Sequence, residues 1–229
     1  MARDNSPWDR QRRDLQRKRP QRANHDRILI VSEGRKTEPN YFREIRAHYR
    51  LSATSIEVRC SESGTAPIQV VQYARDLFND GDAHRGIEKR AFERVYAVFD
   101  RDDHDSYYDA LSLTSSLEGK LKNDLRQPVS FAAIVSVPCF EPWLLLHFEA
   151  VLSPIHRSEV LSRLKQHLPR YCKGSSDSFS KTLTHLPLAM QRAVKLSQRF
   201  NPHTDPEPFT AVADLVQILI GLRPETESS

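Results

Sequence analysis

Two periodicities alternate along the first 150 residues, and this alternation restricts the fold more than any other feature. Short apolar runs rich in β-branched and aromatic residues predict buried strands at residues 27–32, 55–60, 94–100 and 130–136. Segments with helical spacing follow them at residues 39–50, 67–80, 106–124 and 141–150. Three of these segments carry a proline near their start, which suits the first turn of a helix. Four strands alternating with four helices predict an α/β fold with a parallel sheet covered on both faces.

The strand signals stop near residue 150, and helical patterns continue to the C-terminus. These patterns cover residues 156–168, 179–200 and 209–222. Pro187 is expected to bend or split the second of them. Loops are expected at residues 172–178 and 201–208. We therefore expect an α/β domain at residues 27–150 and a helical C-terminal region at residues 151–229.

A basic segment precedes the first predicted strand. Residues 1–27 hold nine Arg or Lys against four Asp, a local balance of +5, so the rest of the chain sums to −1 against the overall +4. With almost no aliphatic residues, the arm at residues 1–26 cannot form a core and is expected to be flexible. Two roles suit it equally: contact with nucleic acid or an acidic partner, and solubility of the chain.

The cysteines and the lengths of the apolar runs indicate where the protein works. Cys60, Cys139 and Cys172 lie far apart and form no Cys-x-x-Cys motif, which argues against a disulfide framework or a cysteine zinc site. No apolar run is long enough to span a membrane, and the N-terminus lacks the apolar segment of a signal peptide. We expect a cytoplasmic protein without a membrane partner.

Acidic residues follow two of the predicted strands. Glu33 comes after the first strand and precedes Gly34, which permits a tight turn, and the third strand ends in the Asp-x-Asp motif of Asp100 and Asp102. In doubly wound sheets, functional residues gather beyond the carboxyl ends of the strands, so these three acids are expected to converge. Mg²⁺ takes oxygen ligands and would offset their mutual repulsion. The pattern predicts a Mg²⁺ site, with Mn²⁺ as an alternative ion.

The neighbours of these acids each allow two interpretations. Arg35 and Lys36 either contact a substrate phosphate or balance the acids. Asp103, Asp105 and Glu38 are candidates for outer metal ligands, Asp103 the weakest because an extended backbone turns it away from its neighbours. His104 either shuttles a proton near neutral pH or is a solvated loop residue.

Structural roles compete with the metal-site interpretation. Aspartates often cap helices, and Asp105 stands before the helix expected from Ser106. Glu141 follows the fourth strand, where it either reaches the metal site or caps the next helix, favoured by the helix dipole. The apolar residues after Glu141, and His147 among them, are expected in the core.

The Glu-Gly pair and the Asp-x-Asp motif resemble the two signatures of the Toprim domain. More closely, "ILIVSEGRKTEPNYF", "VFDRDDHD" and "VPCFEPWLLLHFE" resemble the RloB-like family, which is associated with restriction and abortive-infection loci and is paired with an AAA-type ATPase. The resemblance covers roughly residues 27–220. The chain departs from the family pattern at Val137 and Pro142 but keeps every acid of the expected site.

The resemblance implies a Toprim-like, Rossmannoid parallel sheet of about four strands with helices on both faces. It implies that Glu33 is the general acid/base or a metal ligand, and that Asp100 and Asp102 hold Mg²⁺. It also implies that Lys173 in the "YCKG" loop contacts the substrate. The implied activity is cleavage of phosphodiester bonds in DNA or RNA, tRNA included, in anti-phage defence with an AAA/ABC-type ATPase. We also allow for a homo-oligomer.

Two other functions remain open. The chain is alternatively a non-catalytic partner or regulatory module of a defence ATPase, which binds nucleic acid through its basic arm. The intact Glu33, Asp100 and Asp102 favour the nuclease over this module. A response-regulator-like phosphoacceptor also has acids at strand ends, but that fold offers an aspartate pair, not Glu-Gly, after its first strand.

Overall fold

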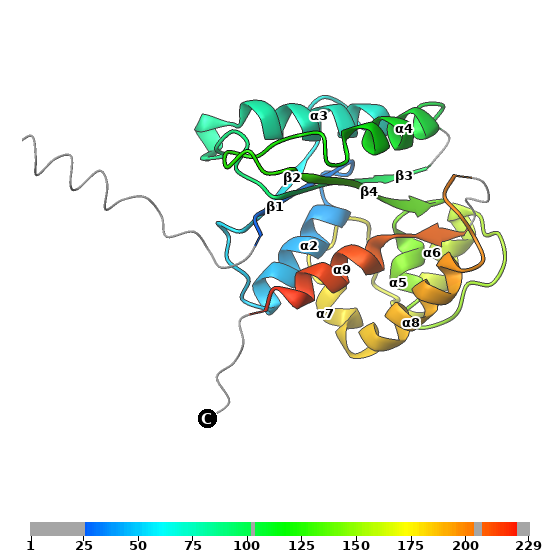
Figure 1. Ribbon diagram of the computed structural model, residues 1–229. Coiled ribbons are helices and arrows are strands. Elements are labelled where there is room, and N and C mark those ends of the chain that lie inside the picture. The colour runs from blue at the N-terminus through cyan, green and yellow to red at the C-terminus, as the bar shows by residue number, and fades with distance from the viewer. Residues whose placement is uncertain (1–25, 102–103, 204–207, 224–229) are drawn as a thin grey trace, which may run out of the picture.

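The computed structural model describes residues 26–101, 104–203 and 208–223. Parallel strands alternate with helices along its first part, as the sequence predicts (Figure 1). The strands are β1 (Ile28–Ser32), β2 (Ile56–Cys60), β3 (Arg94–Asp100) and β4 (Ser130–Val137). The helices are α2 (Thr37–His48), α3 (Pro67–Asp80), the 3₁₀ turn η1 (Ala83–Arg85), α4 (Tyr107–Leu117) and α5 (Glu141–Leu145).

Two of these helices are shorter than the sequence pattern predicts. The pattern extends α4 to residue 124, but the helix ends at Leu117 and Gly119 follows with a left-handed backbone, φ 65°. Glycine adopts this conformation at helix ends without steric cost. The pattern extends α5 to residue 150, but after Leu145 the chain continues as irregular turns.

A fifth strand completes the sheet, in the order β2-β1-β3-β4-β5. Strands β1 to β4 are parallel, whereas β5 (Phe209–Thr210) runs antiparallel to β4. The helix predicted from residue 209 is wrong at its start, because Phe209 and Thr210 pair with β4 and α9 (Val212–Gly221) begins after them. A two-residue strand is too short to show an alternating pattern in the sequence.

Helices cover both faces of the sheet (Figure 1). Side chains of α3 and α4 pack against Leu29, Val31 and their neighbours on one face. Side chains of α2 and of the C-terminal helices pack against Ile28, Ile30 and their neighbours on the other. Because both faces are buried, each strand appears in the sequence as a nearly continuous apolar run.

The C-terminal region is helical, as predicted. It contains α6 (Arg157–His167), α7 (Ser178–Thr182), the 3₁₀ turn η2 (Leu183–His185), α8 (Leu186–Ser197) and α9. Pro187 lies in the first turn of α8, which confirms the predicted split. Within the described ranges, no helix is both long and apolar enough to cross a membrane.

Candidate functional site

The carboxyl ends of β1 and β3 are neighbours at the point where the strand order reverses. From β1 the chain crosses to β2 on one side, whereas β3 lies on the other side of β1. In open α/β sheets such a switch point forms the crevice that holds ligands. The Glu33 amide donates to the Val98 carbonyl at 2.9 Å, which holds residue 33 beside the end of β3.

The Glu33 carboxylate reaches the last residue of β3. Its Oε2 accepts a hydrogen bond from the backbone amide of Asp100 at 3.0 Å. The structure therefore brings together Glu33 and Asp100, two of the three acids expected to converge. Asp102 and Asp103 lie outside the described residues. His104 lies in the turn before α4, where its amide donates to the Arg101 carbonyl at 3.5 Å.

Glu38 places a buried carboxylate beside this pair. It lies in the first turn of α2, where the positive end of the helix dipole favours an acid. Its side chain belongs to a residue only 8 % exposed, and its Oε2 has no hydrogen-bond donor in the described part of the chain. A Cβ on Gly34 would collide with this oxygen. The glycine of the Glu-Gly pair therefore leaves room for the Glu38 carboxylate.

Glu141 brings a fourth carboxylate from the start of α5. Its Oε1 accepts a hydrogen bond from the Tyr171 hydroxyl at 3.1 Å and lies 3.3 Å from the Lys173 ammonium. The residue is 1 % exposed, and its Oε2 has no donor within the described residues. Phe140, not Glu141, holds the N-cap position of α5. Glu141 lies in the first turn of α5, where the helix dipole favours an acid, so the geometry suits both interpretations of this residue.

Burial raises the pKa values of three of these carboxyl groups, and neighbouring charges raise two of them further. Burial raises the pKa of Asp100 well above its usual range, and the negative charges of Glu38, Glu33 and Glu141 raise it further. Burial also raises the pKa of Glu38 to about 7, with smaller contributions from Glu33 and Glu141. The pKa of Glu33 is raised by burial, although the Asp100 amide opposes the change. This cluster therefore favours either bound protons or a nearby cation.

The loop between α6 and α7 delivers Lys173 to the cluster and is fixed to α2. The amide of Gly174 donates to the Thr37 hydroxyl at 3.0 Å, and the Asn40 side-chain amide donates to the Gly174 carbonyl at 3.0 Å. Helix α2 thus carries Glu38 and also positions Lys173. The sequence gives no signal for Thr37, Asn40 or Tyr171, because their partners lie far away along the chain.

These groups surround an open cavity of about 380 Å³. Three carboxylates line it, those of Glu33, Glu38 and Asp100. Four cations line it as well, those of Arg35, Lys36, Arg157 and Lys173. Arg157, at the start of α6, was not predicted. Carboxylates beside cations in one polar cavity can bind a metal ion and a phosphate together.

The donor chemistry of the acids fits Mg²⁺. All are oxygen ligands, and buried oxygens of Glu38 and Glu141 lack a donor among the residues described. Over residues 26–101, 104–203 and 208–223, however, no three or more His, Cys, Asp or Glu are already grouped to hold a metal ion. The described acids therefore supply the ligand types of a magnesium site but not a closed coordination shell.

A comparison with protein families identifies the chain. The family model described as RloB-like protein matches residues 28–219, which is most of the chain. The chain belongs to the RloB-like family. Searches of curated proteins and of solved structures found no match. In this RloB-like protein the matched range includes both acidic strand ends, α2, Glu141 and the Lys173 loop.

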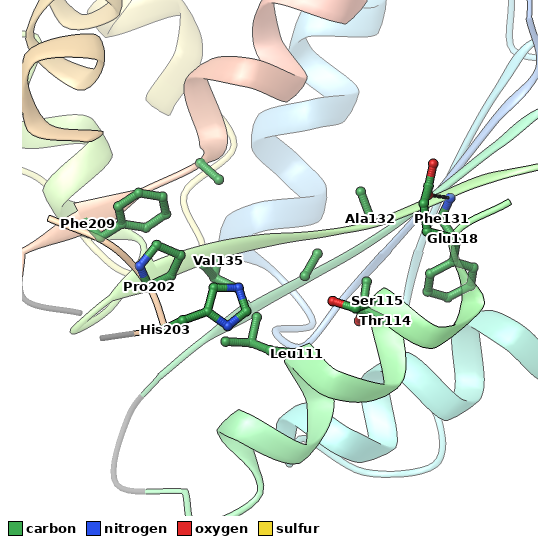
Figure 2. Close-up of a pocket in the computed structure, with 12 residues that line it drawn as sticks. Leu111, Thr114, Ser115, Glu118, Phe131, Ala132, Val135, Pro202, His203 and Phe209 are labelled. Atoms are coloured by element: carbon green, nitrogen blue, oxygen red, sulfur yellow. Dashed lines mark hydrogen bonds between the residues drawn. The ribbon is translucent and has the colours of Figure 1, made fainter. Parts of the chain in front are cut away.

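A second cavity of the RloB-like protein, about 310 Å³, lies between α4 and the edge of β4 (Figure 2). Most of its lining is apolar, with Pro202 and His203 at one end. Glu118 is the single acid among its described lining residues, and its carboxylate accepts from the Phe131 amide at 2.6 Å. Without converging ionisable groups, this cavity is not a candidate for the chemistry.

His147 is a core residue, as predicted. It is 1 % exposed, and its Nδ1 lies 3.0 Å from the Trp143 carbonyl. Burial lowers the pKa of His147 to about 4, so the ring is neutral at physiological pH. Its role in the RloB-like protein is to pack and to satisfy a backbone acceptor.

Gly34→Ala is expected to destabilise the protein by about 1 kcal/mol, the low end of the usual cost of overpacking, because the group it meets is the end of a flexible side chain. The new methyl group would displace the buried Glu38 carboxylate. In a Glu38→Ala background the same change should cost much less, whereas in Glu38→Gln, which keeps the size of the side chain, the cost should persist. Urea unfolding of the single and double variants measures this coupling. An equal cost in all three backgrounds would contradict the packing argument.

Proposed function

We propose that this RloB-like protein is a Mg²⁺-dependent Toprim-type nuclease that cleaves phosphodiester bonds of DNA or RNA. The observation that carries the proposal is the convergence of the Glu33 and Asp100 carboxylates at the ends of β1 and β3, beside a cavity with four cations. Acids with raised pKa values in a cavity at a topological switch point are typical of a functional site.

The residues of the site suggest distinct roles. Glu33, Asp100 and Glu38 would hold the ion, with Asp102, Asp103 and Glu141 as further ligands. When bound, Mg²⁺ offsets negative charge on the phosphoryl oxygens and activates water.

Proton transfer and phosphate binding fall to the side chains themselves. Glu33 has a raised pKa, so its carboxyl exchanges a proton with an attacking or leaving oxygen closer to neutral pH than an ordinary glutamate. Arg35, Lys36, Arg157 and Lys173 line the same cavity and bind the phosphate of the substrate. Tyr171 holds the Glu141 carboxylate in place.

Membership of the family supports the biological setting of the proposal. Because the chain resembles proteins of restriction and abortive-infection loci, we propose that it acts in anti-phage defence, in the cytoplasm, with an AAA/ABC-type ATPase. The ATPase would control when the nuclease acts. We extend the proposal to tRNA as a substrate, and to a homo-oligomer as the working form.

A cleavage assay tests the proposal. Plasmid DNA and tRNA are incubated with the full chain in Mg²⁺, Mn²⁺ or chelator, with and without an ATPase encoded beside it. We expect cleavage that needs the metal and is lost in Glu33→Gln. Nucleic-acid binding without cleavage under all of these conditions would instead support the non-catalytic module.

Deletion of residues 1–25 is expected to leave the melting temperature nearly unchanged and to weaken nucleic-acid binding. The deletion removes eight Arg or Lys but keeps the ion pair of Asp26 with Arg94 at 2.8 Å and that of Arg27 with Glu93 at 3.2 Å. Each lost phosphate contact flattens the slope of log K against log salt by about 0.9 on duplex DNA. Binding titrations at several salt concentrations measure the slope, and an unchanged slope would show that the arm makes no phosphate contact.

A further inference from the structure

Helix α8 and the two residues that follow it, 198 and 199, carry a row of cations on one side. Arg192, Lys195 and Arg199 are spaced at i, i+3 and i+7, which places them on one side of the helix, and Leu188 precedes them by one turn on the same side. Neither residues 186–203 nor residues 150–158 contain an acidic residue. Three of the described residues that line the neighbouring groove are cations, Arg192, Lys195 and Arg199, and none is an acid.

An apolar groove runs beside this row of cations. Leu146, Val151 and Leu196 are buried at the groove, and Leu152 on its other side is 62 % exposed. The groove holds a hollow of about 40 Å³, compared with the about 10–15 Å³ that one water molecule needs, so it can admit a small aliphatic group. Arg192 donates to the Leu146 carbonyl at 2.7 Å, which ties α8 to the far wall of the groove.

A merely solvated helix does not account for this combination. Such a helix usually mixes charges of both signs at i, i+4 spacing and keeps its leucines inside. Here Leu188 is 46 % exposed and Leu152 is 62 % exposed, directly beside the cations. Helix α8 lies on the side of the sheet opposite to α3 and α4 (Figure 1), and none of these residues lines the acidic cavity.

We propose that this surface docks an acidic amphipathic segment of a partner protein. Aliphatic side chains of that segment enter the groove beside Leu152, and its carboxylates pair with Arg192, Lys195 and Arg199. A helix that lays its apolar face into a groove is a common mode of peptide recognition. A protein segment fits better than nucleic acid, because the leucines offer nothing to a phosphate. The proposal does not depend on the nuclease activity.

The probe is a labelled synthetic peptide with leucines at i, i+3, i+4 and i+7 and glutamates between them. Its controls are a scrambled peptide of the same composition and a single-stranded oligonucleotide of the same charge. Fluorescence anisotropy with the full chain gives the affinities. We expect the amphipathic peptide to bind about tenfold or more tightly than the scrambled one, a difference of about 1.4 kcal/mol.

The variants avoid Arg192, because it supports the groove. Lys195→Glu with Arg199→Glu should weaken the amphipathic peptide about tenfold, and Leu152→Ser should weaken it several-fold. Lys165→Glu, an exposed charge reversal on α6, should change the affinity less than twofold. Thermal melts check that each variant folds, and the double Lys195→Gln, Arg199→Gln variant replaces any charge reversal that does not. The proposal would be overturned if the wild type bound both peptides equally, or if the variants bound the amphipathic peptide as tightly as the wild type does. It would also be overturned if the variants lost binding to the oligonucleotide but not to the peptide.

Discussion

Asp100→Asn is expected to abolish cleavage and, without metal, to raise the melting temperature near pH 8. Removal of one charge-stabilising group from an active site typically costs about 10²–10³-fold in rate. The stability gain has an electrostatic cause. The charges of Glu33, Glu38 and Glu141 act on Asp100, so a neutral isostere relieves repulsion within this cluster of carboxylates.

The pH dependence gives this prediction a definite sign. A carboxyl whose pKa is raised by folding binds its proton more tightly in the folded state, so it contributes stability at low pH that is lost as pH rises through the folded pKa. For Glu38 that loss extends from about pH 4 through about pH 7 and is on the order of 3 kcal/mol. We expect the metal-free wild type to lose stability over this range, and Asp100→Asn to lose less.

Thermal melts between pH 5 and 8, with and without Mg²⁺, measure both effects. Magnesium should stabilise the wild type by mass action and the variant much less. Asp109→Asn, on the exposed side of α4, is the matched control and should alter neither response. If Asp100→Asn melts lower than the wild type and keeps the full Mg²⁺ response, Asp100 has a structural role and the metal-site interpretation is wrong.

Lys173→Met is expected to lower cleavage by about 10²–10³-fold and the free energy of unfolding by about 1–3 kcal/mol. The side chain of Lys173 is 50 % exposed, but that of its partner Glu141 is 1 % exposed. Removing the cation therefore leaves a buried carboxylate without its counter-charge. Solvent reaches the lysine, so the loss should fall below the 3–5 kcal/mol typical of fully buried pairs.

Two further variants separate the charge effect from the loss of a lysine. Lys181→Met breaks an exposed pair with Asp177, and we expect it to cost less than about 1 kcal/mol and to leave cleavage unchanged. Adding Glu141→Gln to Lys173→Met should restore stability but not cleavage. Urea unfolding and the cleavage assay report the two quantities. Equal losses in Lys173→Met and Lys181→Met would show that burial of Glu141 has no energetic consequence.

The sequence predicts the sheet and its two central acids because both depend on local patterns. Each parallel strand is buried on both faces and so forms an apolar run, and Glu33 and Asp100 directly follow or end such runs. Their meeting then follows from the order of strands in a doubly wound sheet. Neither inference needs a contact between distant side chains.

The rest of the site depends on contacts that no local pattern encodes. Tyr171 and Glu141 are 30 residues apart, and Gly174 meets Asn40 and Thr37 across 134 and 137 residues. The space that Gly34 leaves for Glu38 is likewise visible only when α2 is in place. The two-residue β5 gives no periodic signal, so the sequence pattern predicts a helix over its residues.

The attachment of the Lys173 loop to α2 means that the chain cannot be divided into one half that holds the acidic site and another that is accessory. A fragment that stops at residue 150 would keep Glu33, Asp100 and Glu141 but lose Arg157 and Lys173. It would also uncover the sheet face that α8 and α9 help to bury. Any substitution that moves the C-terminal helices and this loop therefore changes the charge balance of the acids as well.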